Sequence, residues 1–250
     1  MSESTLTICG LASVRSVAKE TPSLIERLFF TDENSPLFAE ACRYLAGVRK
    51  TYRMVSGDEL RKITDTAHHQ GAAAVMRRPE ALSLTTASIL AAALCLHDVM
   101  NPHNIGAIAR TAAFFGMPQM IVSRKTYEAA MTASAWRVAE GGLTHMEMMV
   151  YDSPAELFAW AESRARLLAA VKPEKNRRRT LTEFLRDKNK WMPVVCLGNE
   201  EDGLPAEFVS RCSGHFTIPG SGKVESLNVS VAAALCIHEL ARHHSGRGPE

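Results

Sequence analysis

The stretch Phe216-Thr217-Ile218-Pro219-Gly220-Ser221-Gly222-Lys223-Val224-Glu225-Ser226-Leu227-Asn228-Val229-Ser230-Val231-Ala232 is the most informative part of the chain. A β-prone segment ends at Pro219, and two glycines then permit a tight turn or a close approach to a ligand. Small and apolar residues recur at helical spacing from Asn228 to Leu240, which predicts a helix buried on most of its circumference. Polar residues just before a helix lie beside unpaired backbone N–H groups, so this loop predicts a binding site.

Simpler interpretations of this loop remain open. Ser226 or Asn228 can be an ordinary helix cap. The segment 220–223 is similar to a Walker phosphate loop, which needs Gly at position 217 and Ser or Thr at position 224; Thr217 and Val224 stand there instead. The Gly-rich signature of Rossmann-type methyltransferases is missing as well, because Glu225 occupies the place of its third glycine.

The composition is that of an ordinary globular protein. The 250 residues are 46% hydrophobic and 22% charged, which allows one large domain or two small ones. No apolar run approaches the roughly 18 uncharged residues of a membrane span. The first 20 residues show no basic-then-apolar signal pattern, so we expect neither a membrane segment nor export.

The cysteines and histidines favour a reduced, metal-free protein. The six cysteines form no Cys-x-x-Cys pair, and most lie among apolar neighbours, which is typical of core thiols in the cytoplasm. His238-Glu239 begins like a zinc-protease helix motif, but position 242 is Arg242 and the next histidine, His243, comes one residue late. We therefore expect a cytoplasmic location and no metal site.

The first part of the chain, from about residue 7 to 76, alternates short strands and helices and predicts a small α/β domain. Its expected helices are 11–19, 37–47 and one that starts at 56; its expected strands are 24–30, 51–55 and 72–76. The pattern breaks at Arg77-Arg78-Pro79-Glu80. We therefore predict a first domain at 1–78, a linker at 79–92 and a second domain at 93–250.

The second domain starts a new strand–helix series. Its expected strands are 93–96, 120–122, 167–171 and 193–197, and its expected helices are 105–115 and 154–166, followed by a last strand and helix. The strands are nearly continuous apolar runs, which is typical of a parallel sheet covered on both faces. The predicted fold class is therefore α/β, with a mostly parallel sheet in the second domain.

Three polar, glycine-containing loops follow strands in this second domain, at 101–110, 198–203 and 218–228. Ligands of open parallel sheets bind at the carboxyl ends of the strands. Each loop alone is a weak signal, because Asn-Pro and Gly-Asn are common turn pairs. Their occurrence together predicts one shared site.

The three loops resemble the three motifs of SpoU-type (TrmH-like) RNA ribose methyltransferases of the SPOUT superfamily. The matching residues are Asn101-Pro102-x-Asn104-x-Gly106-x-x-x-Arg110-Thr111-Ala112, Leu197-Gly198-Asn199-Glu200-x-x-Gly203-Leu204, and Ile218-Pro219-Gly220 with Ser226-Leu227-Asn228-Val229-Ser230-Val231-Ala232. The likeness covers about residues 94–240. The first domain is similar to the L30e-like substrate-binding domain of many members, although Ala12 stands where many relatives carry Asn.

The resemblance implies a deep trefoil knot in the second domain, S-adenosyl-L-methionine as methyl donor, and a homodimer in which both subunits build the site that RNA reaches. The implied substrate is a ribose 2′-hydroxyl in rRNA or tRNA, and the two-domain layout favours rRNA. The residues implied to bind the cofactor are Leu197, Gly198, Asn199, Ile218, Gly220, Ser226 and Leu227. The implied catalytic set is Arg110, Asn104, Glu200, Ser226 and Asn228.

The chemistry of these side chains limits their roles. A guanidinium stays protonated at ordinary pH, so we expect Arg110 to orient the RNA and stabilise developing negative charge rather than act as a base; otherwise it is a helix-surface arginine in a salt bridge. Asn104 shapes the catalytic loop or caps a helix, and Glu200 holds the third loop or the substrate, or is a plain turn carboxylate. We expect Ser226 and Asn228 to fix the cofactor loop and the Arg110 side chain, since no sequence arrangement supports a serine triad.

Basic residues gather in two places where phosphate contacts are expected. They are Lys172, Lys175, Arg177, Arg178 and Arg179 in one loop, and Arg49, Lys50, Arg53, Arg77 and Arg78 in or beside the first domain. A charge run is equally well a solvated loop. The second hypothesis for the whole chain is an RNA-binding knotted paralogue that transfers no methyl group, and a nucleotide hydrolase fails on the spacing around Lys223.

Overall fold

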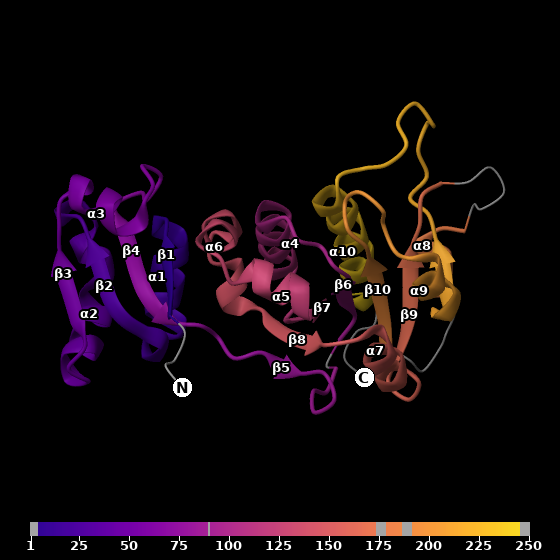
Figure 1. The fold of residues 1–250 in the computed structure, drawn as a ribbon, viewed down its shortest axis with the longest axis horizontal. Helices are drawn as coiled ribbons and strands as arrows, with labels where there is room; N and C mark the ends of the chain where they lie inside the picture. The colour runs from indigo at the N-terminus through magenta and orange to yellow at the C-terminus, as the bar shows by residue number, and fades with distance from the viewer. Residues whose placement is uncertain (1–4, 90, 174–178, 187–191, 246–250) are drawn as a thin grey trace.

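The computed structural model describes residues 5–89, 91–173, 179–186 and 192–245, which form two sheets (Figure 1). The first sheet has the strand order β1-β4-β2-β3 and the second the order β11-β9-β10-β6-β7-β8-β5. Among the described residues, no helix is long and apolar enough to cross a membrane.

The first sheet is mixed and carries the small α/β unit that the sequence predicts. β4 pairs antiparallel with β1 and β2, and β2 pairs parallel with β3. The α3 helix begins as expected, because the Ser56 hydroxyl accepts a hydrogen bond from the Glu59 backbone N–H at 3.2 Å. The first strand, β1, is missing from the sequence prediction. In order, the elements are β1 (Thr5–Cys9), α1 (Leu11–Glu20), η1 (Pro22–Leu24), β2 (Ile25–Phe30), η2 (Asp32–Phe38), α2 (Ala39–Gly47), β3 (Thr51–Met54), α3 (Gly57–Thr64) and β4 (Ala72–Arg77).

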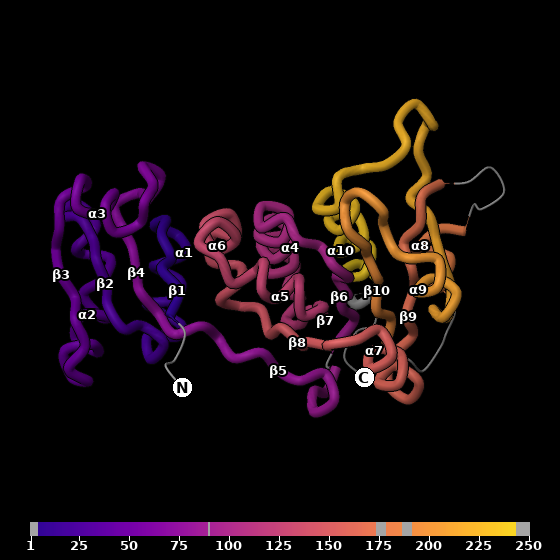
Figure 2. The backbone as a smooth tube through the Cα atoms, viewed as in Figure 1, coloured from indigo at the N-terminus to yellow at the C-terminus, as the bar shows by residue number. Residues whose placement is uncertain are grey.

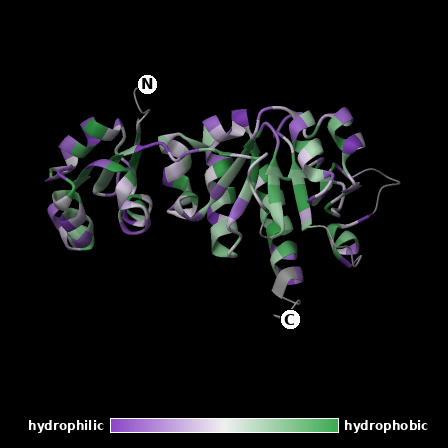
Figure 3. Ribbon diagram, turned by 90° about the horizontal axis from the view of Figure 1, so that it is seen from below, coloured by the Kyte–Doolittle hydropathy of each residue, from purple (hydrophilic) through white to green (hydrophobic). Residues whose placement is uncertain are grey.

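The second sheet is parallel at every pairing, which confirms the predicted fold class. Its strands are hydrophobic along most of their length (Figure 3), because helices cover both faces. The strands are β5 (Leu82–Ser83), β6 (Ala93–Leu96), β7 (Gln119–Ser123), β8 (Glu147–Tyr151), β9 (Ala165–Ala170), β10 (Met192–Leu197) and β11 (Gly214–Phe216). The helices are α4 (Pro102–Phe114), α5 (Arg124–Ala130), α6 (Ala133–Ala139), η3 (Gly142–His145), α7 (Pro154–Ala161), α8 (Leu181–Arg186), α9 (Ala206–Arg211) and α10 (Val229–Ser245).

Several predicted boundaries in this part are wrong. The helix expected at 105–115 begins earlier, at Pro102, because the Asn101 side chain caps it by accepting a hydrogen bond from the His103 backbone N–H at 2.9 Å. Asn104 is therefore not the cap. The helix expected at 154–166 ends at Ala161, since β9 already starts at Ala165. The segment 124–151, with α5, α6 and β8, was not predicted.

The last helix, α10, is buried along one face only, so the expectation of burial on most of its circumference is wrong. Its buried residues are Val229, Ala233, Cys236, Ile237 and Leu240, which recur at helical spacing. On the other side Val231 and Leu235 remain 49% and 45% exposed. In a single chain, the apolar side chains of Val231 and Leu235 are therefore exposed on the outer face of α10.

The two sheets are joined through α6 and η3 rather than by the connecting segment alone. The tube of Figure 2 shows α6 between the first sheet and α4, and one hydrophobic cluster runs from Val14 and Val17 of α1 to Trp136 of α6. The buried Ser13 hydroxyl donates a hydrogen bond to the Trp136 carbonyl at 2.5 Å. This continuous core holds α1 against the second domain.

Candidate active site

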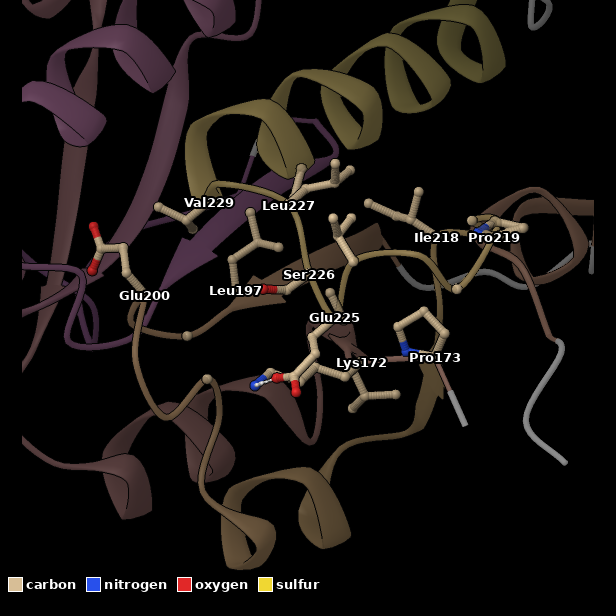
Figure 4. Close-up of a pocket in the computed structure, with 18 of the residues that line it drawn as sticks. Lys172, Pro173, Leu197, Glu200, Ile218, Pro219, Glu225, Ser226, Leu227 and Val229 are labelled. Carbon is tan, nitrogen blue, oxygen red and sulfur yellow. Dashed lines mark ion pairs between the residues drawn. The ribbon is translucent and has the colours of Figure 1, made fainter. Parts of the chain in front are cut away.

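Two of the three polar loops of the second domain, 198–203 and 218–228, line one cavity of about 210 Å³ (Figure 4), and Asn104 of the third loop bonds to both of them. One lining loop follows β10, and the other follows β11 and leads into α10. All seven residues that the family resemblance assigns to the cofactor line this cavity: Leu197, Gly198, Asn199, Ile218, Gly220, Ser226 and Leu227. Ala170 at the end of β9 and residues 171–173 after it close another side.

Hydrogen bonds within the turn after β10 hold its shape. The Asn199 Oδ1 atom accepts hydrogen bonds from the backbone N–H groups of Glu201 and Asp202 at 3.0 and 2.7 Å. The Gly203 N–H donates back to the Asn199 carbonyl at 3.1 Å. A Cβ on Gly198 would lie 2.1 Å from the Gly203 carbonyl carbon, so only glycine fits at that position.

Asn104 ties the three loops together beside the cavity. Its Nδ2 atom donates to Glu200 Oε1 at 2.5 Å, and its Oδ1 atom accepts from Asn228 Nδ2 at 3.1 Å. Asn104 is 8% exposed, whereas Glu200 and Asn228 are exposed, so both bonds are partly buried. Asn228 Oδ1 also accepts from the Ser230 N–H at 2.8 Å, so Asn228 caps α10 and joins the network at once.

Arg110 does not line the cofactor cavity. Its guanidinium pairs with Glu140 Oε2 at 2.9 Å, and the two side chains are 57% and 45% exposed. Arg110 comes six positions after Asn104 in α4, so the two side chains leave the helix about 120° apart and about 9 Å apart along the axis. The expected contact of Ser226 and Asn228 with Arg110 is therefore not formed within one chain. Within one chain, Arg110 forms the helix-surface ion pair that the sequence analysis left open as the alternative.

At the start of the loop after β6, His97 contacts two buried aromatic side chains, an arrangement that the sequence analysis missed. His97 Nδ1 lies 2.8 Å from the Tyr151 hydroxyl, and the His97 ring packs against Phe208 with centroids 4.6 Å apart. Burial lowers the pKa of His97, partly offset by the neighbouring carboxylate of Asp98. The signal available in the sequence was the His97-Asp98 pair directly after a buried strand.

Asp98 itself adopts a left-handed backbone conformation, with φ at 55°, and pairs with Lys125 Nζ at 2.6 Å. Burial opposes ionisation of Asp98, but hydrogen bonds from Lys125 and Ser123 outweigh it and hold the pKa of the carboxyl below its ordinary value. The pair fixes the path of the chain from β6 into α4.

The predicted basic clusters are only partly described. Lys175, Arg177 and Arg178 lie outside the described residues. Lys172 lines the cavity, 3.9 Å from Glu225, and the Arg179 guanidinium lies 3.8 Å from the centre of the Phe184 ring. In the first domain, Lys50 and Arg77 share Glu26, and Arg53 pairs with Glu59, while Arg78 pairs with Glu128. Within the described ranges, no group of three or more His, Cys, Asp or Glu side chains is placed to hold a metal ion.

Comparison with known families gives two matches. The SpoU rRNA Methylase family matches residues 91–238, and the family of RNA 2′-O ribose methyltransferase substrate-binding domains matches residues 7–82. The chain belongs to the SpoU rRNA methylase family. The predicted family resemblance is thus confirmed.

This SpoU-family chain is similar over nearly its whole length to named relatives. It is 30% identical to the 23S rRNA (guanosine-2′-O-)-methyltransferase RlmB of Nitrosomonas europaea, covering 96% of this chain and 92% of that protein. It is 29% identical to RlmB of Acinetobacter baylyi, with coverages of 95% and 97%. An uncharacterized tRNA/rRNA methyltransferase of Escherichia coli O157:H7, YfiF, is 27% identical, with coverages of 95% and 68%.

Solved structures share the fold of this SpoU-family chain. An AdoMet-bound rRNA methyltransferase from Sinorhizobium meliloti superposes with a TM-score of 0.79 at 18% identity, covering 96% of this chain and 87% of the other. The SpoU methyltransferase AviRb from Streptomyces viridochromogenes, also in complex with AdoMet, gives 0.74 at 19% identity, with coverages of 96% and 91%.

Proposed function

We propose that this protein is an S-adenosylmethionine-dependent RNA methyltransferase that methylates a ribose 2′-hydroxyl in rRNA or tRNA, with rRNA favoured. The observation that carries the proposal is the convergence of two family motifs on one cavity, to which Asn104 of the remaining motif is tied through Glu200 and Asn228. The RlmB relatives, named as 23S rRNA 2′-O-methyltransferases, support rRNA over tRNA. We place the protein in the cytoplasm on the same grounds, and we retain the trefoil knot and the domain division at 79–92 as predictions.

The residues around the cavity suit S-adenosylmethionine. Leu197, Ile218 and Val229 offer apolar contacts for an adenine ring, and the backbone near Gly198 and Leu227 offers polar groups that can recognise its edge. Glu200 and Glu225 provide two negative charges against the single positive charge of Lys172, which favours a cationic ligand. When bound, the cofactor supplies a methyl group on a sulfonium.

The catalytic contribution of the chain is alignment and electrostatics. The buried Asn104 side chain holds the cavity loops in one arrangement through its two hydrogen bonds, so that the accepting oxygen and the methyl group can be brought into line. We assign Arg110 to the RNA phosphate and to the negative charge that grows on the ribose oxygen. Its ion pair with Glu140 is exposed, and an exposed pair of this kind is weak and easily exchanged.

We propose that two chains form the working enzyme. Exposed apolar side chains gather at the end of α4 and on the outer face of α10: Phe114 is 83% exposed and Leu235 45%. Phe115 and His238 pack together at 5.8 Å, so the two helices present one surface. A second copy would cover this surface, and a dimer can complete the site with residues from its other subunit.

Calorimetric titration with S-adenosylmethionine separates the enzyme from the alternative, an RNA-binding paralogue without methyl transfer. The enzyme should give a saturable heat of binding, and Arg110→Ala should retain most of it while losing methyl transfer by about 100-fold or more. A protein that binds RNA but gives no heat with the cofactor would be the paralogue. An Arg110→Ala variant as active as the original would overturn the role of Arg110.

A further inference from the structure

A second cavity, of about 420 Å³, lies between the two domains and contains the side of α4 that carries Arg110. The first domain contributes His68 and Gln70 from the loop before β4. The second domain contributes Arg110 from α4, and Arg137, Val138 and Glu140 from α6 and its end. Arg110 is the one lining residue that belongs to a sequence motif, and no residue of this cavity lines the cofactor cavity.

Close backbone contacts fix the walls of this interdomain cavity. A Cβ on Gly142 would lie 2.7 Å from the Arg110 Cα, so the chain after α6 packs directly on α4. One on Gly141 would lie 3.0 Å from Ser16 of α1, and one on Gly10 would lie 3.5 Å from Arg137 Cγ. The turn that follows α6 therefore sets both the position of Arg110 and the distance to the first domain.

The charges in the interdomain cavity favour an anion. Two cationic side chains, those of Arg110 and Arg137, line the cavity together with a single carboxylate, that of Glu140. Glu140 pairs with Arg110, whereas Arg137 has no ion-pair partner among the described residues. Glu140 holds a left-handed backbone conformation, with φ at 45°, and its side chain is 45% exposed. Two cationic side chains and one exposed, exchangeable carboxylate leave the cavity with a net positive charge, which matches the chemistry of a phosphodiester.

We propose that the interdomain cavity binds a phosphodiester of the RNA strand close to the methylated nucleotide. The phosphate takes the place of Glu140 on Arg110 and contacts Arg137, while Gln70 and His68 of the first domain lie over the adjoining nucleotide. The first domain thus acts as one wall of the RNA site and sets the path of the strand past Arg110. This inference rests on the proposed function, because it takes RNA as the substrate.

The test measures binding of a short fluorescein-labelled single-stranded RNA of mixed sequence by anisotropy, over a range of KCl concentrations. We expect Arg137→Gln to weaken binding about 3- to 10-fold and to reduce the slope of log Kd against log salt by about 0.7, the value for one phosphate contact on a single strand. Arg137→Lys should restore the slope, because it keeps the charge. Glu140→Gln should tighten binding by about 2- to 5-fold, since the phosphate then displaces no carboxylate.

A matched control is available in the ion pair of Arg124 and Asp152, also 2.9 Å long and outside the cavity lining. Asp152→Asn removes the same charge and should leave RNA affinity unchanged. Opposite effects of Arg137→Gln and Glu140→Gln cannot both arise from partial unfolding. Equal affinities and slopes for these two variants and the original protein, or an Asp152→Asn effect as large as that of Glu140→Gln, would overturn the inference.

Titration of the same proteins with S-adenosylmethionine distinguishes failure of the cavity assignment from failure of the proposed function. Arg137→Gln and Glu140→Gln should bind the cofactor like the original protein, since neither side chain lines the cofactor cavity. An original protein that binds RNA through this cavity but binds no cofactor would contradict the proposed function and leave the cavity assignment intact. Normal cofactor binding with RNA affinity indifferent to both variants would contradict the cavity assignment alone.

Discussion

Asn104 and Glu200 lie 96 positions apart in the chain, and a hydrogen bond of 2.5 Å joins the amide nitrogen of one to the carboxylate of the other. The same amide accepts a bond from Asn228, so one side chain connects all three motif loops. An amide can donate and accept at once, which neither a carboxylate nor an ammonium group can do. The residue type at position 104 is thus dictated by the two partners it faces.

Substitution of Asn104 and Glu200, singly and together, tests how much their hydrogen bond contributes to stability. Asn104→Asp places a carboxylate against that of Glu200 and should lower the free energy of unfolding by about 1–3 kcal/mol. Adding Glu200→Gln restores a donor–acceptor pair of the same shape and should recover most of the loss. Urea unfolding of both single variants and the double variant measures the coupling. A double variant no more stable than Asn104→Asp alone would show that the bond contributes nothing.

The turn after β10 should tolerate no side chain at Gly198. In Gly198→Ala the new Cβ would meet the Gly203 backbone, so we expect a loss of about 1–3 kcal/mol in unfolding free energy and weaker cofactor binding. Gly220→Ala is the control for stability, because a Cβ there meets no atom within 4 Å. Equal stability of the two variants in urea would mean that the turn is not closely packed.

Stability should fall on mild acidification because of His97. Burial lowers its pKa in the folded state, so the unfolded chain takes up the proton first as the pH drops through about 6.5. The free energy of unfolding should therefore decrease between about pH 7.5 and about pH 5.5. His97→Gln should flatten this dependence, whereas replacement of the exposed His103 should not. An unchanged pH profile in His97→Gln would exclude this histidine as the source.

The outer face of α10 should control association. Leu235→Glu puts a charge on the exposed apolar surface shared with α4 and should weaken dimerisation by about tenfold or more in sedimentation experiments, with little effect on folding. Met54→Lys is the control, because Met54 is 55% exposed but lies on β3 of the first domain. A protein that sediments as a monomer before any substitution would contradict the proposed dimer.

Much of this arrangement was predictable because it is local. Buried strands such as 72–76 and 93–96 are short apolar runs, and the polar loops follow strands whose carboxyl ends meet at one edge of a parallel sheet. The convergence of Leu197, Ile218 and Leu227 on one cavity follows from that geometry together with the family resemblance.

What the sequence could not supply depends on distant contacts. The α6 helix is seven residues long, and its place is set by packing against α1 and α4, so periodicity gave no sign of it. The pairing of Arg110 with Glu140 follows from that packing and redirects a motif residue away from the cofactor cavity. For the same reason the interdomain cavity has no local sequence signature.

Transfer of a radiolabelled methyl group from S-adenosylmethionine to ribosomal RNA tests the central claim most directly. The RNA should come from a strain that lacks this protein, so that the target position is unmodified. We expect incorporation by the original protein, loss in Arg110→Ala, and a product in which the label resides on a ribose 2′-oxygen after digestion to nucleosides. Cofactor binding with the label absent from both ribosomal and transfer RNA, or found on a base, would contradict the account.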